Sequence, residues 1–222
     1  MSQSQTSQAH SPEPAHAAAA PTLSLVDAMP TFAPRHERDR QALEASRAVV
    51  GLYLREGTAE LPVKLLAEHA GLSERTFYRT FPTKEDTIRP YVEAGMYHVV
   101  DQVREAPLDR PLREVLINAH ADLLDAASAH GGVVFLELLR QNEPLRAVWL
   151  KVITDAEAAF AEVIAARLGV APGSVQARLA GAAVVTAGRL ALEPLSPGQR
   201  ASEVFEGCLD LMGPALFERS PS

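Results

Sequence analysis

The residues from 73 to 79 combine polar groups with one large apolar side chain. Phe77 belongs in a core, whereas the residues around it can reach outward with polar groups: Ser73, Glu74, Arg75, Thr76, Tyr78 and Arg79. The guanidinium group of Arg75 can bond O6 and N7 of a guanine together. These residue types indicate recognition by hydrogen bonding, and we expect the segment to enter the major groove of duplex DNA.

Two short predicted helices joined by a tight turn would hold these side chains in place. Leu66 and Ala70 fall on one face of the first helix, together with Ala67, which is small enough to let a second helix cross closely. Gly71 can adopt the positive φ of a sharp turn, and Ser73 is a suitable N-cap for the second helix. This is the pattern of a helix-turn-helix. The alternative is an ordinary helical hairpin with a glycine corner.

The run Phe77-Tyr78-Arg79-Thr80-Phe81-Pro82-Thr83-Lys84-Glu85-Asp86 resembles the end of the DNA-binding domain of the TetR family of bacterial transcriptional regulators. The resemblance extends from about residue 40 to residue 94. It implies that Tyr78 and Lys84 hold phosphates. Thr76 would contact a thymine methyl group or a phosphate. Glu74 could accept a hydrogen bond from cytosine N4, but we favour a role in stabilising the helix N-terminus.

Two other groups of residues bear on phosphate binding. Three arginines lie at the start of the first predicted helix, where they would either approach phosphates or remain solvated: Arg35, Arg38 and Arg40. Many family members have phosphate-binding threonines at positions where this chain has other residues: Leu61, Pro62 and Val63. Whether this chain contacts the DNA phosphate backbone at these three positions is therefore left open.

The resemblance also implies a homodimer that binds an inverted repeat, because one head reads only a few base pairs. The last two helices would form the interface. Small residues would let backbones approach, at Ala180, Gly181, Ala183, Val184, Ala187 and Gly188, and apolar cover would come from Leu209, Leu211, Met212 and Leu216. The alternative is that these residues form an intramolecular core.

Composition and pattern favour an all-α fold of about nine helices. The chain has 222 residues, of which 47% are hydrophobic and 5% aromatic, and strand-like alternation is almost absent. We expect helices over 38–56, from about 62, from 73, from 83 to the prolines after 106, and over 112–129, 133–141, 144–168, 174–192 and 199–217. This predicts a disordered arm over 1–34, a helix-turn-helix domain over 35–83, and a ligand-binding and dimerisation domain over 84–222.

The remaining features of the composition fit a cytoplasmic protein, and the resemblance implies a bacterial one that associates with the nucleoid when it binds DNA. Cys208 is the single cysteine, so no internal disulfide can form. No apolar run reaches membrane-spanning length and no signal peptide is recognisable, so we expect no membrane partner. The net charge is −7, yet residues 35–104 hold 11 basic and 11 acidic residues, so the excess acid lies outside the predicted reading head.

The predicted helix over 144–168 has apolar residues on more than one face, which indicates a cavity as well as a packing surface. Its flanks resemble weakly the TetR members linked to acyl-coenzyme-A-like ligands. We expect a small apolar or acyl-coenzyme-A-like effector that releases the protein, as a repressor, from its operator. Residues that could orient this effector, or serve the structure instead, are Asn118, His120, Glu137, Arg140 and Thr186, with Trp149 as a cavity wall or core residue.

No catalytic constellation, metal-ligand spacing or cofactor-binding motif is present in the sequence. We therefore predict no catalytic residues, no metal and no cofactor. Two functional classes remain: a ligand-responsive DNA-binding repressor that is not an enzyme, and a helical small-molecule-binding module or enzyme whose hairpin does not bind DNA. Salt-dependent binding to a palindromic duplex separates them.

Overall fold

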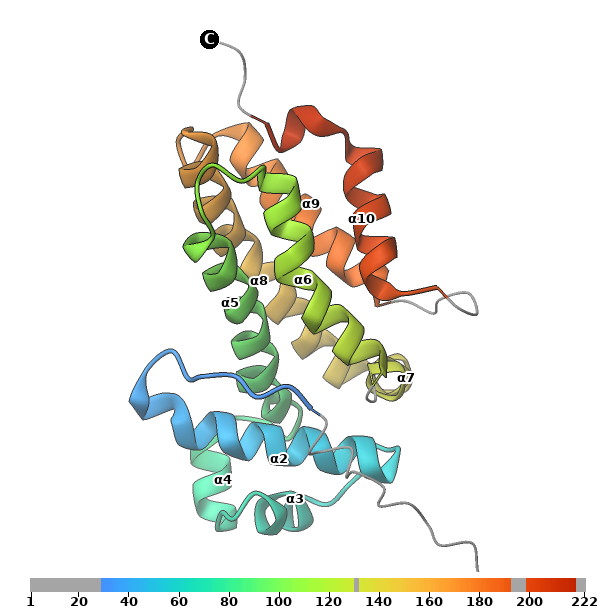
Figure 1. Ribbon diagram of the computed structural model, residues 1–222. Helices are drawn as coiled ribbons and strands as arrows, with labels where there is room; N and C mark the ends of the chain where they lie inside the picture. The colour runs from blue at the N-terminus through green and yellow to red at the C-terminus, as the bar shows by residue number, and fades with distance from the viewer. Residues whose placement is uncertain (1–28, 130–131, 193–198, 219–222) are drawn as a thin grey trace, which may run out of the picture.

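The computed structural model describes residues 29–129, 132–192 and 199–218, and within these residues the regular structure is entirely helical. The predicted all-α fold is confirmed. Figure 1 shows α2, α3 and α4 gathered at one end of the molecule, with α5 leading from them into the larger helical part. The nine α-helices of the described residues are α2 (Arg40–Glu56), α3 (Val63–His69), α4 (Glu74–Thr80), α5 (Arg89–Glu105), α6 (Leu112–Ala129), α7 (Gly132–Gln141), α8 (Glu143–Leu168), α9 (Val175–Ala191) and α10 (Ala201–Met212).

We call α2, α3 and α4 the small part of the chain and α6 to α10 the larger part. Glycines and caps set the ends of the helices in the small part. α2 ends at Gly57 and the turn after α3 contains Gly71; both have positive φ, of 64° and 68°, which a side chain would strain. Before α5, the amide of Asp86 donates to Thr83 Oγ1, and the amide of Thr83 donates to Asp86 Oδ2. This reciprocal cap begins a short 3-10 helix, η2 (Glu85–Ile88), which leads directly into α5.

The closest helix crossing lies between α8 and α9. A Cβ atom built on Gly181 of α9 would lie 2.5 Å from the carbonyl oxygen of Glu157 in α8. Ala180, Val184 and Ala187 are fully buried in the same helix. Of the small residues predicted to approach a second subunit, Gly181 therefore packs on α8 and its buried neighbours pack within the chain, whereas a Cβ atom on Gly188 would meet nothing within 4 Å. Leu209 of α10 is also buried, whereas Leu211 is 91% exposed.

Two segment boundaries differ from the sequence-based expectation. The predicted arm extends to residue 34, but Met29 is buried and Phe32 packs on α5, because both side chains fill space next to Tyr91. The rest of that arm, residues 1–28, lies outside the described residues, as do 130–131, 193–198 and 219–222. The predicted helix over 199–217 ends at Met212, because Gly213 adopts φ 82° and ψ 157° and Pro214 follows it.

A buried arginine fixes the larger part to the end of α5. The side chain of Arg167 in α8 is 6% exposed and donates to four carbonyl oxygens around the α5–α6 loop. Its Nη1 lies 2.7 Å from Ala106 O and 3.4 Å from Val103 O, and its Nη2 lies 2.8 Å from Pro107 O and 3.0 Å from Arg110 O. These bonds hold the guanidinium group in place and tie the far end of α5 to the larger part.

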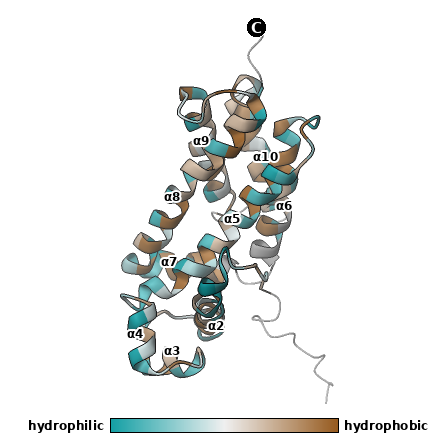
Figure 2. Cartoon of the chain, turned by 90° about the vertical axis from the view of Figure 1, so that its left-hand side faces the viewer, coloured by the Kyte–Doolittle hydropathy of each residue, from teal (hydrophilic) through white to brown (hydrophobic). Residues whose placement is uncertain are grey.

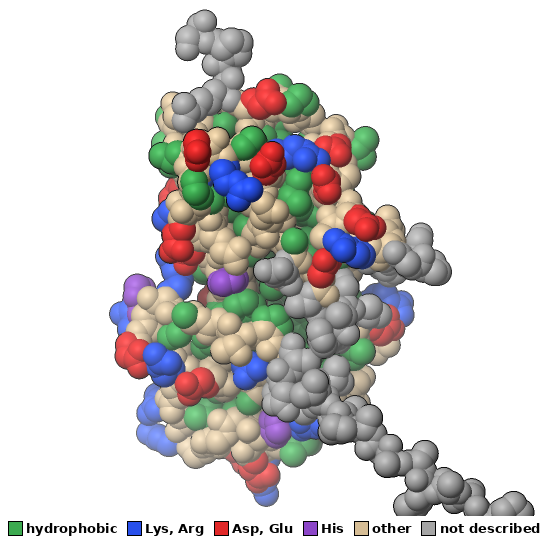
Figure 3. All heavy atoms as spheres, in the orientation of Figure 1, with side chains coloured by type: hydrophobic (Ala, Val, Ile, Leu, Met, Phe, Trp, Pro, Cys, Tyr) green, Lys and Arg blue, Asp and Glu red, His purple; other side chains and the backbone are tan. Residues whose placement is uncertain are grey.

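Hydropathy and charge differ between the small part and the larger part of the chain. Figure 2 shows hydrophilic residues over much of α4 at the outer end of the small part, and hydrophobic residues along the inner sides of α8 and α9. In the space-filling view of Figure 3, basic and acidic side chains are interspersed over the small part. No helix among the described residues is both long enough and apolar enough to cross a membrane.

Candidate functional site

Helix α4 presents polar side chains outward because two aromatic residues anchor its other face. Phe77 and Phe81 are 0% and 1% exposed, and their rings meet edge to face at 5.3 Å between centroids. Their positions turn Arg75, Tyr78 and Arg79 to the solvent, and Tyr78 is 55% exposed although it is large and apolar in part. An exposed tyrosine between two exposed arginines suits contact with a polyanion.

The N-terminus of α4 is capped as the sequence predicts. The amide of Thr76 donates to Ser73 Oγ at 3.2 Å, and the two hydroxyl groups lie 3.0 Å apart. Glu74 occupies the first turn, where its negative charge stabilises the helix dipole. Ser73 and Thr76 therefore position the helix, and their hydroxyl groups remain close enough to its tip to accept or donate a further hydrogen bond.

Lys84 follows α4 and is held by the loop between α2 and α3. Its Nζ lies 3.5 Å from Glu60 Oε2, and its side chain is 26% exposed. The other oxygen of the same carboxylate, Oε1, accepts a hydrogen bond of 2.8 Å from Asn142, which caps α8. Glu60 thus joins a predicted phosphate-binding lysine to the helix that begins the longest element of the larger part.

The arginines around the start of α2 have partners within the chain. The guanidinium of Arg35 lies 3.8 Å from the centroid of the Tyr97 ring, and Arg40 makes two hydrogen bonds with Glu37. Arg38 lies 3.7 Å from Asp39 and stays highly exposed. Pro62 is the residue that precedes α3 and has an extended backbone. It offers no side-chain donor for a phosphate.

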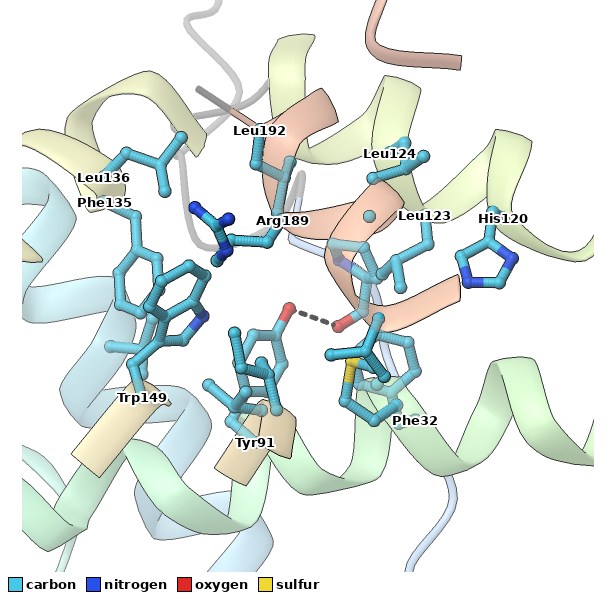
Figure 4. A pocket seen from close by; sticks show the side chains of 18 of the residues that line it. Phe32, Tyr91, His120, Leu123, Leu124, Phe135, Leu136, Trp149, Arg189 and Leu192 are labelled. Atoms are coloured by element: carbon cyan, nitrogen blue, oxygen red, sulfur yellow. Dashed lines mark hydrogen bonds between the residues drawn. The ribbon is translucent and has the colours of Figure 1, made fainter. Parts of the chain in front are cut away.

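An apolar cavity of about 170 Å³ lies between the small and the large part of the chain. Its wall includes Val50 and Leu54 from α2, so a helix of the small part forms one side of it. The opposite wall comes from α8 and α9 and includes Trp149 and Val184. Figure 4 shows how side chains from several helices converge on this space. A molecule in the cavity would touch both parts at once.

A short strap before α2 closes part of the cavity. We use this name for residues 29–34, of which Met29, Pro30 and Phe32 line the wall. The hydroxyl of Tyr91 donates to Pro30 O at 3.0 Å, the bond drawn in Figure 4, and Arg47 of α2 donates to Met29 O at 3.1 Å. The strap is therefore bonded to α2 and to α5, which carry the small part.

The wall contains few polar groups, and the sequence identified only part of them. His120 and Trp149 were predicted and line the cavity, and His120 is 4% exposed. Tyr91 and Arg189 also line it and were missed, because each lies in a helix whose pattern explains it as a surface or packing residue. The other predicted residues lie away from this wall: Asn118, Arg140 and Thr186 are exposed, and Glu137 is half-buried.

Physical reasons account for these four placements. Glu137 and Arg140 are one helical turn apart and bond each other through two contacts of 2.6 and 2.8 Å. Asn118 and Thr186 lie on the outer faces of α6 and α9, opposite the residues that those helices bury. The structure thus brings His120 and Trp149 together at the cavity and leaves the remaining four outside it.

Two titratable groups of the cavity wall, His120 and Tyr91, have pKa values shifted toward their neutral forms. Burial lowers the pKa of His120 to about 4, although the backbone hydrogen bond with Leu116 opposes the shift. Burial likewise raises the pKa of Tyr91 to about 12. Both side chains are therefore uncharged at neutral pH. Among the described residues, no group of three or more His, Cys, Asp or Glu side chains could hold a metal ion. Burial also raises the pKa of the half-buried Cys208 thiol, which opposes reactivity.

Residues 47–88 match the family model described as bacterial regulatory proteins, tetR family. Over 83% of its length, the chain has a similar fold to the TetR-family repressor AlkX from a Dietzia species, implicated in biodegradation of n-alkanes; the match covers 97% of that chain, with a TM-score of 0.59 and 18% identity. The transcriptional regulator FadR from Bacillus subtilis, solved in complex with stearoyl-CoA, gives a TM-score of 0.53 and 18% identity over 80% and 98% of the two chains. Comparison with curated proteins yields no match.

The matched segment runs from the middle of α2 to the end of η2, and so contains the whole helix-turn-helix. Residues 47–88 therefore carry a helix-turn-helix domain of the tetR family type, and the described fold is similar to that of TetR-family transcriptional regulators. The domain match favours DNA binding over a helical module whose hairpin does not bind DNA.

Proposed function

We propose that the protein is a homodimeric repressor that binds an inverted-repeat operator and leaves it when a small, mostly apolar molecule fills the cavity. The observation that carries this proposal is the position of the cavity. Its wall includes Val50 and Leu54 of α2, which belongs to the DNA-binding part. A bound molecule would therefore contact α2, a helix of the DNA-binding part, directly.

The heads would contact DNA through α4 and its flanks. Arg75 is exposed at the start of α4 and is our candidate for a base contact, while Arg79 and Tyr78 face the same solvent side. Lys84 would bind a phosphate after exchanging Glu60 for it. Because these roles need only hydrogen bonding and charge, we propose that the protein acts by binding and not by catalysis, in the cytoplasm and at the bacterial nucleoid.

The ligand would change the spacing of the two heads through α5 and the strap. Gly95 of α5 leaves room for the Phe32 ring, which a Cβ atom there would approach to 3.3 Å. A ligand that displaces Phe32 would shift α5 and the start of α2 together. The conformation that binds the operator must then bind the ligand more weakly than the released conformation does, or no release occurs.

The size of the cavity favours a compact effector. A volume of about 170 Å³ is close to that of apolar cavities of about 150 Å³ that hold a benzene molecule. Of the two proteins with a similar fold, AlkX is implicated in the biodegradation of n-alkanes, and FadR forms a complex with stearoyl-CoA. A long acyl thioester would require the cavity to enlarge, so we propose a small apolar molecule and treat acyl-coenzyme A as the competing ligand.

The test is selection of bound duplexes from a random pool, followed by release assays on the selected operator. We expect an inverted repeat, nanomolar affinity and a steep loss of affinity with salt. The release panel contains small aromatic compounds, short fatty acids and acyl-coenzyme A. If no preferred sequence is recovered, the proposal of a specific operator is wrong. If acyl-coenzyme A alone releases the protein, the proposal of a compact ligand is wrong.

A further inference from the structure

His120 is a buried polar residue at one end of an otherwise apolar cavity. It lies on α6, and Figure 4 shows its ring at the opposite end of the cavity from Trp149. The ring stacks on Phe205 at 4.2 Å between centroids and on Phe160 at 5.6 Å. These aromatic contacts fix the plane of the imidazole, so its nitrogen atoms have defined directions.

The hydrogen bond of the ring fixes its tautomer. His120 Nδ1 lies 2.8 Å from the carbonyl oxygen of Leu116, which can only accept, so Nδ1 carries the proton. The neutral ring then leaves Nε2 as an acceptor. Among the residues that the structure describes, none donates a hydrogen bond to Nε2. An acceptor without a donor at an apolar cavity wall offers a bound molecule one hydrogen bond.

We propose that the cavity binds one small, flat molecule that is apolar except for a single hydrogen-bond donor, and that His120 Nε2 accepts from this donor. The inference rests on the proposed function, because it names the chemical class of the effector. Phenols and small aromatic alcohols belong to this class. The apolar wall around Trp149 takes the ring, and His120 distinguishes a ligand with a donor from one of the same shape without it.

Phenol and toluene are suitable probes because they have nearly the same size and differ in one donor. The full chain is titrated with each compound by calorimetry, with Trp149 emission as a second readout, since the chain has 1 tryptophan and it lines the cavity. We expect phenol to bind at least as tightly as toluene, although its hydroxyl group must leave water.

Two variants separate the acceptor from the cavity. In His120→Phe, which keeps an aromatic ring, the Kd of phenol rises about tenfold while that of toluene changes little, because the hydroxyl group is then buried without a partner. His36→Phe is the matched control, since His36 is exposed before α2 and does not line the cavity. It leaves both affinities unchanged.

Several results would overturn the inference: no binding of either probe to the wild type, toluene more than tenfold tighter than phenol, or an unchanged phenol affinity in His120→Phe. Benzoate is titrated as well, because Arg189 also lines the wall. Tighter binding of benzoate than of phenol would assign recognition to Arg189 and overturn the role of His120. Operator binding is measured in parallel. If phenol binds with the expected dependence on His120 but leaves operator affinity unchanged, the site is supported and the proposed release mechanism fails.

Discussion

Burial keeps His120 neutral, and among the described residues no charged side chain is bonded to it. Its pKa falls from 6.5 to about 4, and the carbonyl of Leu116 counteracts only part of this shift. The neutral form fits the two aromatic rings that enclose it. A protonated imidazole there would lose its hydration without gaining a counter-ion. Acidification therefore acts on the fold through this residue.

The direction of the pH effect follows from the two pKa values. The unfolded chain binds a proton at His120 near pH 6.5 and the folded chain only near pH 4, so the stability contributed by the neutral ring is present above 6.5. This stability is lost as the pH falls from 6.5 to about 4, and no more of it is lost below about 4. Between pH 7 and pH 5 we expect the wild type to lose about 2 kcal/mol more than His120→Phe. Urea unfolding at both pH values measures this difference, and parallel losses in the two proteins would contradict the buried neutral state.

The residues of the reading head make a second prediction. Arg75→Ala should relax specificity at one base pair of each half-site, at a cost of about 1–3 kcal/mol for the preferred base. Lys84→Ala should weaken binding to all sequences alike and reduce the salt slope by about one unit. Competition binding with single-base operator variants, repeated over a salt series, distinguishes the two effects. Unchanged binding in both variants would remove α4 from the interface.

The head residues were predictable from the sequence, whereas most of the cavity residues were not. Ser73, Gly71 and Phe77 act through local rules of capping, turn geometry and helical period, which a sequence displays. A cavity forms where an apolar face of a helix does not pack completely against the neighbouring helix. Periodicity cannot show this, so Asn118 was placed in the cavity when it lies on the outer face of α6, and Arg189 was missed.

At the scale of elements, Glu60 connects three segments that are far apart in the sequence. Its carboxylate bonds Lys84 next to α4 and Asn142 at the start of α8, from a loop between α2 and α3. A phosphate that binds Lys84 must compete with this carboxylate. Movement of α8 relative to the head can change that competition, because Asn142 holds the other oxygen.

Glu60→Gln should therefore raise DNA affinity. The amide keeps an oxygen for Asn142 but removes the charge that holds Lys84, and an exposed pair of this kind contributes up to about 1 kcal/mol, or roughly fivefold in affinity. Glu56→Gln is the matched control, because it removes one exposed charge from the same part and its partner is Arg55. Operator titrations at two salt concentrations make the comparison. An equal gain in both variants would show a general effect of net charge and no competition at Lys84.

The elements also show why helix number was easier to predict than helix partners. Gly57, Gly169 and the prolines mark helix ends in the sequence, and nine α-helices follow within the described residues. Gly181 belongs to a stripe of small residues that fits any close crossing. The stripe does not reveal whether the crossing helix is α8 of the same chain or a helix of a second copy. In the structure it is α8.

At the scale of the whole molecule, the outer faces of α9 and α10 remain for assembly. Val175 and Leu179 on α9 are 79% and 57% exposed, and Leu211 on α10 is 91% exposed, which is unusual for large apolar side chains. Most small residues of α9 are buried within the chain, which leaves these outward residues as the apolar surface of α9 and α10 for a dimer contact. We propose that two copies meet through them, in the two-fold arrangement that an inverted repeat requires.

The double variant Leu179→Glu with Leu211→Glu should be monomeric at micromolar concentration, because two carboxylates on each subunit would be desolvated in the interface. Sedimentation measures the mass, and gel shifts on full and half operators measure the consequence. We expect binding to the inverted repeat to fall by about 100-fold or more, with half-site binding unchanged, since the heads themselves are intact. Val134→Glu is the control, because Val134 is 37% exposed on α7, which packs mainly against α6 and α8. A double variant that still sediments as a dimer would place the interface elsewhere, and a monomeric wild type would contradict the paired reading of the operator.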